Sequence, residues 1–366
     1  MTELVQHPPP PSTPPPPLGQ SVPKAEHPSA SELVALYQHM LLSRRLETRV
    51  IELYRQNQIT GGVYTGHGNE ATSVGTAFAM AKDDVLVPTH RDMGSHLVRG
   101  HTAEEIMLQY LKRKASQTGG KDSGLHIGRE GSNIVGMISH LAHMMPVAVG
   151  VALAERQKGT NAAVLTSVGE GASSLGDFHE ALNFAAVARL PVLFVIVNNQ
   201  YAYSTPRTFQ YAAERLSDRA IGYGMKGETI DGTDVITALA AARRAFARGR
   251  KGEGPTLLES LTMRMRGHSE HDDMKYVPKP LVEAWKAWDP VERLERHLLE
   301  QKISGPAEIE REKAAVEECL DRAVKTALDA APPDGPEAVE GVYRRWSPEW
   351  TPPTGAARLA NEGGGS

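Results

Sequence analysis

The sequence predicts an α/β fold: an open, doubly wound parallel sheet with helices on both faces. Its middle holds two short apolar runs, 162–168 and 192–197, separated by a stretch in which apolar residues recur at helical spacing. A second such stretch, 234–248, leads into a third expected strand, 256–261. Apolar runs of strand length that alternate with helices are typical of parallel sheets covered by helices on both faces.

The first helix is expected to begin after Ser29. Ser29 and Glu32 have the spacing of a capping box, in which each side chain bonds a backbone amide of the other residue. Apolar residues then recur at helical spacing, at Leu33, Leu36, Tyr37, Met40, Leu41, Val50, Leu53 and Tyr54. Residues 1–28 contain 10 of the 25 prolines, so we expect a disordered or polyproline tail there.

The central unit has the pattern of strand, glycine turn, helix and strand. The run 162–168 ends in Gly169-Glu170-Gly171, and the expected helix covers 172–189. Its apolar stripe consists of Leu175, Phe178, Ala181, Leu182 and Ala185. Leu190-Pro191 ends this helix, and the run 192–197 ends at Asn198-Asn199. Such a βαβ unit is right-handed and joins parallel strands.

The expected domain covers 29–330. Within its last part, Asp289 and Pro290 suit the N-cap and the first residue of a helix, and Leu294 and Leu298 give that helix an apolar edge. From 331 to 366 the sequence is rich in Pro and Gly, so we expect a loose C-terminal tail.

Composition narrows the classes of function. The 366 residues carry a formal net charge of −4, which gives no electrostatic basis for binding nucleic acid or an anionic membrane. There is one cysteine, Cys319, so no internal disulfide can form, and we expect a cytoplasmic protein. No apolar run reaches the length of about 18 residues that spans a bilayer.

The ends of the two central strands predict a metal and diphosphate site. Glu170 and Asn199 follow parallel strands about 5 Å apart, at the edge of the sheet where such folds bind ligands. Carboxylate, amide and backbone carbonyl oxygens suit Mg²⁺ or Ca²⁺, and Gly169 and Gly171 let the backbone approach a phosphate. The amides that open the next helix would point at that anion. The alternative is a plain strand-to-helix turn with Glu170 in solvent.

These residues carry a resemblance to a known family. Gly169-Glu170-Gly171-Ala172, then Gly176-Asp177-Phe178-His179-Glu180, then Asn198-Asn199-Gln200-Tyr201 resemble the thiamine-diphosphate fingerprint. More narrowly, the chain is similar to the α subunits of the decarboxylating first component of pyruvate and branched-chain 2-oxo acid dehydrogenase complexes. The likeness covers roughly residues 31–298.

The resemblance implies a set of cofactor ligands at the fingerprint. Glu170, the side chain of Asn199 and the backbone carbonyl of Tyr201 would coordinate Mg²⁺. The amides of Gly171 and Ala172 would support the diphosphate. Glu170 stands where many members of the family have Asp, and this longer carboxylate is found in branched-chain enzymes.

Two earlier segments supply further contacts under the same resemblance. In 88–94, Arg91 would clamp the diphosphate with its planar fork of donors. In 136–141, Ser139 and Leu141 would contact the aminopyrimidine ring.

The segment 264–273 concentrates titratable side chains. Taken alone, His268, His271 and Asp272 form either a polar surface loop or a transition-metal cluster. Under the resemblance this segment is the loop over the cofactor, and His268 is the catalytic, cofactor-binding residue. A neutral imidazole near its ordinary pKa can pass a proton or stabilise charge at the diphosphate end. Ser269 matches a serine that is phosphorylated in mitochondrial relatives.

The implied activity is the oxidative decarboxylation of a 2-oxo acid with thiamine diphosphate and Mg²⁺. The acyl group would pass to a lipoyl-bearing acyltransferase component. A β subunit would be obligate, in a heterotetramer of two α and two β chains, because the family's activating glutamate lies on the β chain. Glu170 and the run 184–186 favour branched-chain substrates over pyruvate or acetoin. A metal-dependent hydrolase built on 268–273 and a non-catalytic regulatory subunit are the other classes considered.

Overall fold

A five-stranded parallel sheet organises residues 21–128 and 131–339, which are the residues that the computed structural model describes. In spatial order its strands are β1 (Val85–Val87), β2 (Val164–Gly169), β3 (Val192–Asn198), β7 (Thr256–Leu261) and β6 (Lys226–Asp231). All neighbouring strands are parallel. The three strands expected from the sequence form the three central strands, and nearly all their residues are buried.

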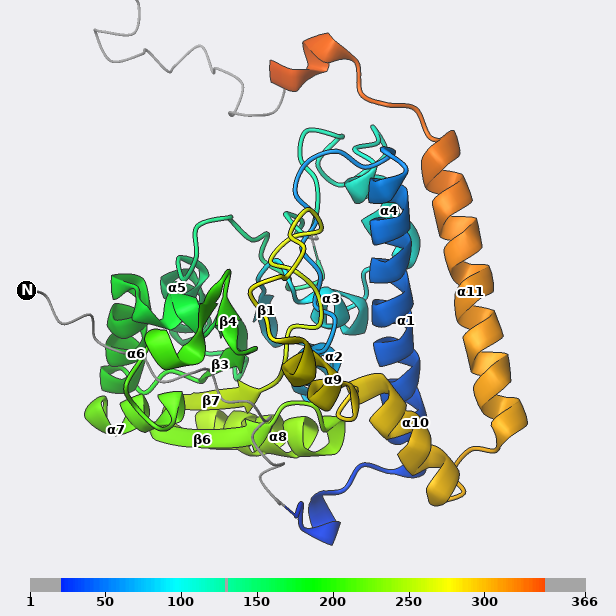
Figure 1. Cartoon of the computed structure of the whole chain (residues 1–366). Helices are drawn as coiled ribbons and strands as arrows, with labels where there is room; N and C mark the ends of the chain where they lie inside the picture. The colour runs from blue at the N-terminus through cyan, green and yellow to red at the C-terminus, as the bar shows by residue number, and fades with distance from the viewer. Residues whose placement is uncertain (1–20, 129–130, 340–366) are drawn as a thin grey trace, which may run out of the picture.

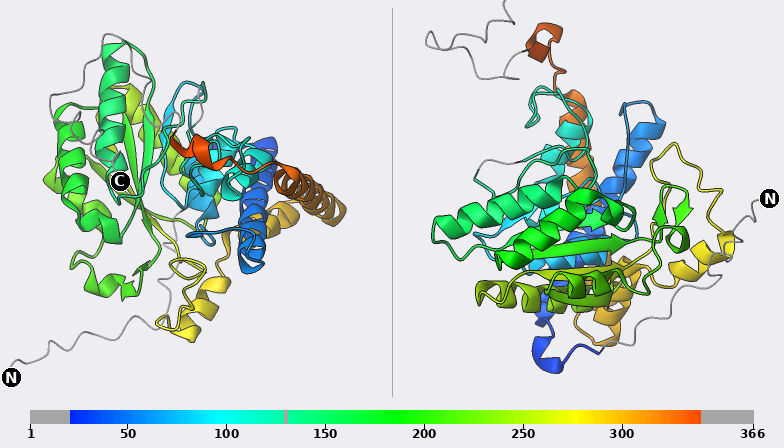
Figure 2. Two further views of the ribbon diagram at one scale, coloured as in Figure 1. Left: turned by 90° about the horizontal axis from the view of Figure 1, so that it is seen from above. Right: turned by 90° about the vertical axis from the view of Figure 1, so that its left-hand side faces the viewer.

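Helices cover both faces of this sheet, so the predicted fold class is confirmed (Figures 1 and 2). One face is covered by α5 (Met144–Gln157) and α6 (Gly176–Val187), which pack on each other. The other is covered by α8 (Val235–Arg250), against which α2 (Glu70–Phe78) packs. Asp234 caps α8 by accepting a hydrogen bond from the Ile236 amide, as its place before the apolar stripe suggests.

The two edge strands, β1 and β6, are not predicted by the sequence pattern. β1 has three residues, too few for a periodic signal. β6 is mostly polar, and only Ile230 in it is buried, because a strand at the edge of a sheet has a neighbour on one side only.

A second layer of helices stands beside the sheet (Figure 1). It consists of α1 (Ala30–Arg55), α3 (Met93–Val98), α4 (Ala103–Tyr110), α10 (Pro290–Glu300) and α11 (Pro306–Asp329). α1 contacts all four of the others, so its buried stripe is the centre of this layer. The predicted capping box at Ser29 and the predicted cap at Asp289 are both present.

The helix of the central unit begins later than the sequence suggests. Residues Gly171–Ser174 form a 3-10 turn, η2, and α6 itself begins at Gly176. Leu175, expected in the packed stripe, is 43% exposed, whereas Phe178, Ala181, Leu182 and Ala185 are buried as expected. A 3-10 turn of four residues therefore stands where the first turn of the helix was expected.

Short elements complete the chain. They are α7 (Arg219–Gly222), α9 (Lys279–Lys286), the two-stranded ribbon β4 (Tyr201–Ala202) and β5 (Thr205–Pro206), and the 3-10 turns η1 (Lys24–Glu26), η3 (Arg207–Phe209), η4 (Leu216–Asp218) and η5 (Gly335–Val339).

Most of the two expected tails, 1–28 and 331–366, lies outside the described residues, which leave out 1–20 and 340–366. The described part of each is held to the domain. Glu26 pairs with Arg244, and Glu337 pairs with Lys114. Within the described residues, no helix is both long enough and apolar enough to cross a membrane.

Candidate active site

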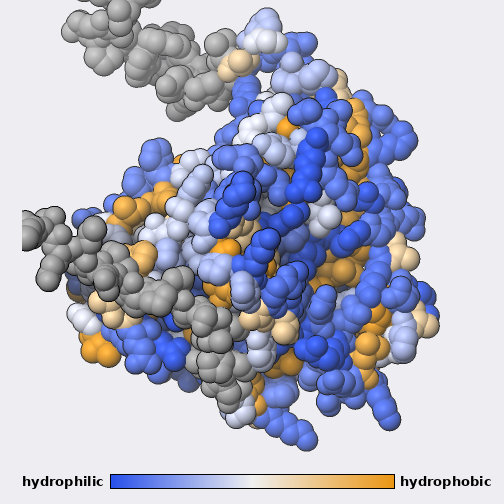
Figure 3. Space-filling view, in the orientation of Figure 1, coloured by the Kyte–Doolittle hydropathy of each residue, from blue (hydrophilic) through white to orange (hydrophobic). Residues whose placement is uncertain are grey.

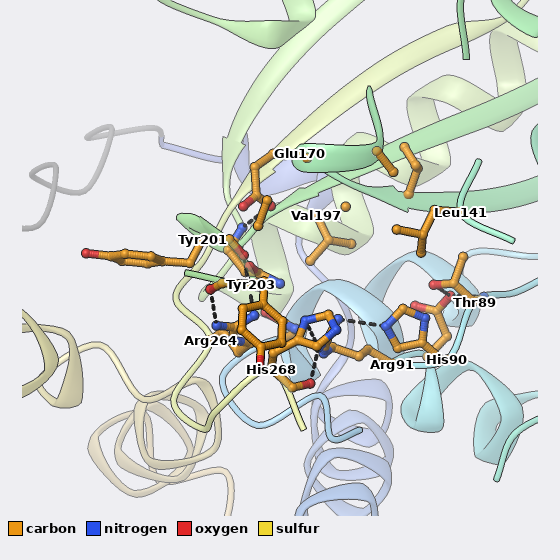
Figure 4. Close-up of a pocket in the computed structure, with 18 of the residues that line it drawn as sticks. Thr89, His90, Arg91, Leu141, Glu170, Val197, Tyr201, Tyr203, Arg264 and His268 are labelled. Carbon is orange, nitrogen blue, oxygen red and sulfur yellow. Dashed lines mark hydrogen bonds between the residues drawn. The ribbon is translucent and has the colours of Figure 1, made fainter. Parts of the chain in front are cut away.

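A cavity of about 440 Å³ opens at the carboxyl ends of β2 and β3 (Figure 4). Its walls come from the turn after β1, the fingerprint after β2, the segment after β3 and the loop after β7, together with the start of α2 and Leu141 before α5. These segments meet because parallel strands end at the same edge of the sheet. Of the residues predicted to contact a cofactor, all except Ser139 line this cavity, namely Arg91, Leu141, Glu170, Gly171, Ala172, Asn199, Tyr201 and His268.

Glu170 and Asn199 lie side by side at the bottom of the cavity. Glu170 is 1% exposed, and its Oε2 accepts a hydrogen bond from the Asn199 amide at 3.2 Å. Burial raises the pKa of the Glu170 carboxyl above its ordinary value. The Asn199 Oδ1 atom is buried and has no hydrogen-bond partner in the described part of the chain. A buried oxygen without a partner next to a buried carboxylate is an arrangement that a hard cation would complete.

The backbone of Tyr201 belongs to the same corner. Gln200 takes a positive φ of 77°, which turns the chain back after β3 and brings the β4–β5 ribbon under the cavity. The Tyr201 ring packs in a small apolar cluster with Met263 and Trp285. The ring is therefore occupied elsewhere, and only the backbone of Tyr201 is available as a metal ligand.

The turn after β2 places Gly171 and Ala172 in the wall of the cavity. Among the described residues, the amides of Gly171 and Ala172 have no acceptor. A Cβ added to Gly171 would lie 2.4 Å from the Ala202 Cβ, so only glycine fits against the ribbon. Gly169 has no such neighbour, since nothing lies within 4 Å of its added Cβ. Contact with the rest of the chain therefore explains a glycine at 171 but not at 169, and the approach of a phosphate to either one stays a prediction.

Two arginines bring positive charge to the cavity without a carboxylate partner in the described residues. Arg91 donates to the His268 carbonyl at 2.6 Å and contacts the His90 ring nitrogen at 2.7 Å, while its Nε is buried without a partner. Burial and the charge of Arg264 lower the pKa of Arg91 to about 10. An anion in the cavity would relieve this uncompensated charge.

Arg91 is held in place by the residue that follows it. Asp92 is buried and accepts hydrogen bonds from the Thr89 amide at 2.7 Å and from the Ser167 hydroxyl on β2. The turn after β1 is thereby tied to the neighbouring strand.

Arg264 is a functional candidate that the sequence reasoning missed. It is 2% exposed and donates to the Tyr203 carbonyl at 2.9 Å and the Tyr276 hydroxyl at 2.8 Å, with a longer contact of 3.4 Å to the Tyr201 carbonyl. It follows the end of β7 by three residues. Its place shortly after a strand end is the one signal in the sequence that points to it.

His268 lies beside Arg91, with a distance of 3.4 Å between its Nδ1 and an Arg91 nitrogen (Figure 4). Burial, followed by the charges of Arg91 and Arg264, lowers the pKa of His268 to about 4. The imidazole is therefore neutral at neutral pH, as expected. The expectation that its pKa lies near the ordinary value is wrong, because two cations oppose its protonation.

The loop that carries His268 is ordered by its own polar side chains. Asp272 accepts hydrogen bonds from the His268 amide at 2.7 Å and from the Tyr276 hydroxyl. Ser269 is 2% exposed and bonds the His271 ring. No group of three His, Cys, Asp or Glu side chains able to hold a metal occurs in the described residues, so the transition-metal cluster considered for this loop is not formed.

Ser139 lines a second, adjoining cavity of about 270 Å³. Its hydroxyl lies 2.9 Å from the His126 Nε2. Leu141 and His268 line both cavities, so the two spaces meet at these side chains. The Tyr64 ring also lines the second cavity and packs edge-on against His268.

Comparisons with known proteins agree on one family. The sequence model described as "Dehydrogenase E1 component" matches residues 38–336. The chain is 39% identical to a 2-oxoisovalerate dehydrogenase subunit alpha of Bacillus subtilis (strain 168), across 86% of this chain and 96% of that protein. It is 30% identical to a pyruvate dehydrogenase E1 component subunit alpha of Porphyra purpurea, across 83% and 90%. It is 33% identical to the subunit alpha of an acetoin:2,6-dichlorophenolindophenol oxidoreductase of B. subtilis, across 87% and 96%.

Proposed function

The chain belongs to the dehydrogenase E1 component family, the thiamine-diphosphate-dependent oxidoreductases of the 2-oxo acid dehydrogenase complexes, and on this premise we propose a branched-chain 2-oxo acid as its substrate. Support comes from the 39% identity to an enzyme subunit named for 2-oxoisovalerate and from Glu170 in the fingerprint. Pyruvate and acetoin are the competing substrates, since relatives named for them are 30% and 33% identical.

The proposed metal is Mg²⁺, with the Glu170 carboxylate, Asn199 Oδ1 and the Tyr201 carbonyl as ligands. The observation that carries this proposal is the unpaired, buried Asn199 Oδ1 beside the buried carboxyl of Glu170. Three oxygen donors with no nitrogen or sulfur ligand suit a hard cation that keeps further positions for phosphate oxygens.

The diphosphate is proposed to lie between the turn after β2 and the side chains of Arg91 and Arg264. The amides of Gly171 and Ala172 would donate to it from below, and Arg91 would pair with it through the fork of its guanidinium. Arg264 adds a second positive charge close by. Leu141 and Ser139 would contact the aminopyrimidine ring, which is consistent with the position of Leu141 where the two cavities meet and of Ser139 in the second cavity.

When bound, thiamine diphosphate supplies the nucleophilic carbon and the electron sink for decarboxylation. The chain's own contribution is orientation and charge. His268 enters the site neutral, with Nδ1 turned to Arg91. Because a diphosphate would offset the two arginine charges, it would raise the pKa of His268 and allow this imidazole to donate a hydrogen bond or a proton.

A β subunit is proposed to close the cavity over an apolar surface on α5 and α6. This α5–α6 surface consists of Leu141, Val147, Leu175, Phe184 and Val187, which are between 38% and 79% exposed. Apolar side chains are visible over these helices at the left of Figure 3. Leu141 and Leu175 also line the cavity, so a partner docked here would reach the cofactor. A contiguous exposed apolar surface is typical of a protein interface.

We further propose an assembly of two α and two β chains that passes its acyl group to a lipoyl-bearing acyltransferase. The support is the family itself. A cytoplasmic location is proposed from the free Cys319.

The test is reconstitution of the chain with its β subunit, Mg²⁺ and thiamine diphosphate. Decarboxylation of 2-oxoisovalerate, 2-oxoisocaproate and pyruvate would be followed with an artificial electron acceptor, and acetoin cleavage would be measured alongside. We expect the highest kcat/KM with a branched substrate and its loss in Glu170→Ala. Preference for pyruvate or acetoin would overturn the substrate proposal only.

The same assay separates the other two classes. A regulatory subunit would tolerate Glu170→Ala and Asn199→Ala without loss of turnover. A hydrolase would act without thiamine diphosphate and depend on His271 and Asp272, which here bond to the loop's own atoms.

A further inference from the structure

Glu259 carries a buried carboxyl group that does not line the cavity. It lies within β7 and is 1% exposed. Its Oε1 accepts a hydrogen bond from Asn198 Nδ2 at 2.7 Å. Its Oε2 accepts from the Ser217 amide at 3.2 Å and from Thr229 Oγ1 at 3.0 Å. In the described part of the chain it has no ion-pair partner. An apolar side chain at this position would avoid the desolvation of a carboxyl group, so packing alone does not account for Glu259.

The donors to Glu259 include both ends of one segment, 198–217. Asn198 is the last residue of β3, and Ser217 lies in η4. Between them the segment carries Asn199, the Tyr201 carbonyl and Gln210, whose amide nitrogen lies 3.4 Å from the Glu170 Oε1. The Glu259 side chain therefore holds both ends of the segment that carries two of the three proposed metal ligands, Asn199 and Tyr201.

Asn198 transmits this anchoring to the metal ligand. Its carbonyl accepts hydrogen bonds from the Thr262 amide and from Gln200 Nε2, both at 3.0 Å. Asn198 and Asn199 share a planar peptide unit, so a rotation of Asn198 displaces Asn199 as well.

We propose that Glu259 is a positioning residue for the metal, which fixes the segment 198–217 so that Asn199 Oδ1 and the Tyr201 carbonyl face Glu170. The proposal rests on the proposed Mg²⁺ and thiamine diphosphate site. Partners that orient metal ligands typically change metal affinity by about 10- to 100-fold when they are removed.

The experiment reverses the polarity of one hydrogen bond in the assembled α and β complex. Glu259→Gln puts an amide where two acceptor oxygens were needed, and Asn198→Asp brings two carboxyl groups together. In the double variant, the new amide at position 259 can donate to the new carboxylate at position 198, and its oxygen can still accept from the Ser217 amide. Thr229→Val is the matched control, because it removes one donor to Glu259 and leaves the contact with Asn198.

Two readouts are needed. The first is binding of Mn²⁺ in the presence of thiamine diphosphate, measured by the loss of the free-ion paramagnetic signal. The second is the dependence of turnover on Mg²⁺ concentration. For each single variant we expect Mn²⁺ affinity to fall and the half-saturating Mg²⁺ concentration to rise by about ten-fold or more, with most of kcat recovered at saturating Mg²⁺. We expect the double variant to regain most of the affinity, and Thr229→Val to change it by less than about three-fold.

The outcomes separate the two proposals. If wild type binds Mn²⁺ with the cofactor but Glu259→Gln has unchanged Mn²⁺ affinity, Glu259 does not position the metal. Equal losses in the single and double variants, with lowered unfolding temperatures and no recovery by Mg²⁺, would make Glu259 a purely structural residue and also overturn the inference. If the wild-type complex itself binds no metal with thiamine diphosphate, the proposed function has failed first.

Discussion

At the scale of single residues, the site depends on space as much as on charge. Gly171 lies against the β4–β5 ribbon so closely that a side chain would push the ribbon away from the strand end. The carbonyl of Tyr201 is on that ribbon, so the displacement would move this proposed metal ligand away from Glu170.

The glycine pair of the fingerprint provides a direct test. We predict that Gly171→Ala weakens binding of thiamine diphosphate with Mg²⁺ by at least about ten-fold, because a Cβ 2.4 Å from Ala202 Cβ must displace the ribbon. Quenching of tryptophan fluorescence in the complex measures the affinity. Gly169→Ala is the control, since its Cβ meets no atom within 4 Å. Adding Ala202→Gly to Gly171→Ala should restore binding, and no restoration would contradict the steric explanation.

The lowered pKa of His268 leads to a prediction about pH. The folded protein keeps this imidazole neutral down to about pH 4, whereas the unfolded chain protonates it near 6.5. Between these values the unfolded state binds more protons, so the contribution of His268 to stability is present above pH 6.5 and is lost as the pH falls towards 4. The slope from one such group is at most about 1.4 kcal/mol per pH unit.

In the cofactor-free complex, His268→Gln should therefore lose less stability than wild type on acidification from pH 6.5 to 4. Thermal unfolding at a series of pH values measures the difference. The exposed His140→Gln serves for comparison, and parallel curves for wild type and His268→Gln would show that the imidazole is not shielded from protons.

Several of these residues were predictable from sequence and others were not. Glu170 and Asn199 were predictable because strand ends are visible as the ends of apolar runs. Arg264 was not recognised, since arginine in a loop is usually a solvated charge, and only the fold shows it to be 2% exposed. The pKa of His268 depends on its burial and on the charges of Arg91 and Arg264, and Arg91 lies far away in the sequence, so no local pattern reveals the shift.

At the scale of elements, the best-predicted features are those with local causes. The capping box of α1 and the cap of α10 follow from side chains within three residues of the helix start. The edge strands β1 and β6 were not predictable, because their structure is imposed by neighbouring strands. The same holds for the late start of α6, where the tight turn after Glu170 competes with helical spacing.

The start of α1 offers a test of stability separate from catalysis. We predict that Ser29→Ala lowers the free energy of unfolding by about 1 kcal/mol, because the Glu32 amide loses its acceptor at the helix start. Ser29→Thr keeps an acceptor and should cost less. Thermal unfolding of the complex measures both, and cofactor affinity should not change in either variant. A change in affinity would mean that α1 is coupled to the site.

At the scale of the whole molecule, the cavity and the α5–α6 surface share two exposed side chains, Leu141 and Leu175. This arrangement fits a chain that supplies one part of a shared site. Val187 is 79% exposed and Phe184 is 51% exposed, although neither has a role inside the chain.

The α5–α6 surface can be tested without the chemistry. We predict that Val187→Asp leaves the circular dichroism of the α chain unchanged but weakens its association with the β chain by at least about ten-fold, since a charge would have to be desolvated in the interface. Leu328→Asp on α11, at a position 38% exposed, is the control. Sedimentation of mixtures of the two chains measures the association. Equal association of Val187→Asp and wild type would place the partner elsewhere.

The strand order also affects how the chain folds during its synthesis on the ribosome. β3 pairs with β2 on one side and with β7 on the other, yet β7 ends at Leu261, well after β3 ends at Asn198. During synthesis at about 5 to 20 residues per second, β3 therefore presents an apolar, unpaired edge for several seconds. β6 emerges in that interval but cannot cover this edge, because its partner is β7. An unpaired apolar edge can aggregate with other chains. A chaperone that covers β3 would therefore protect the nascent chain most before residue 261 has left the ribosome.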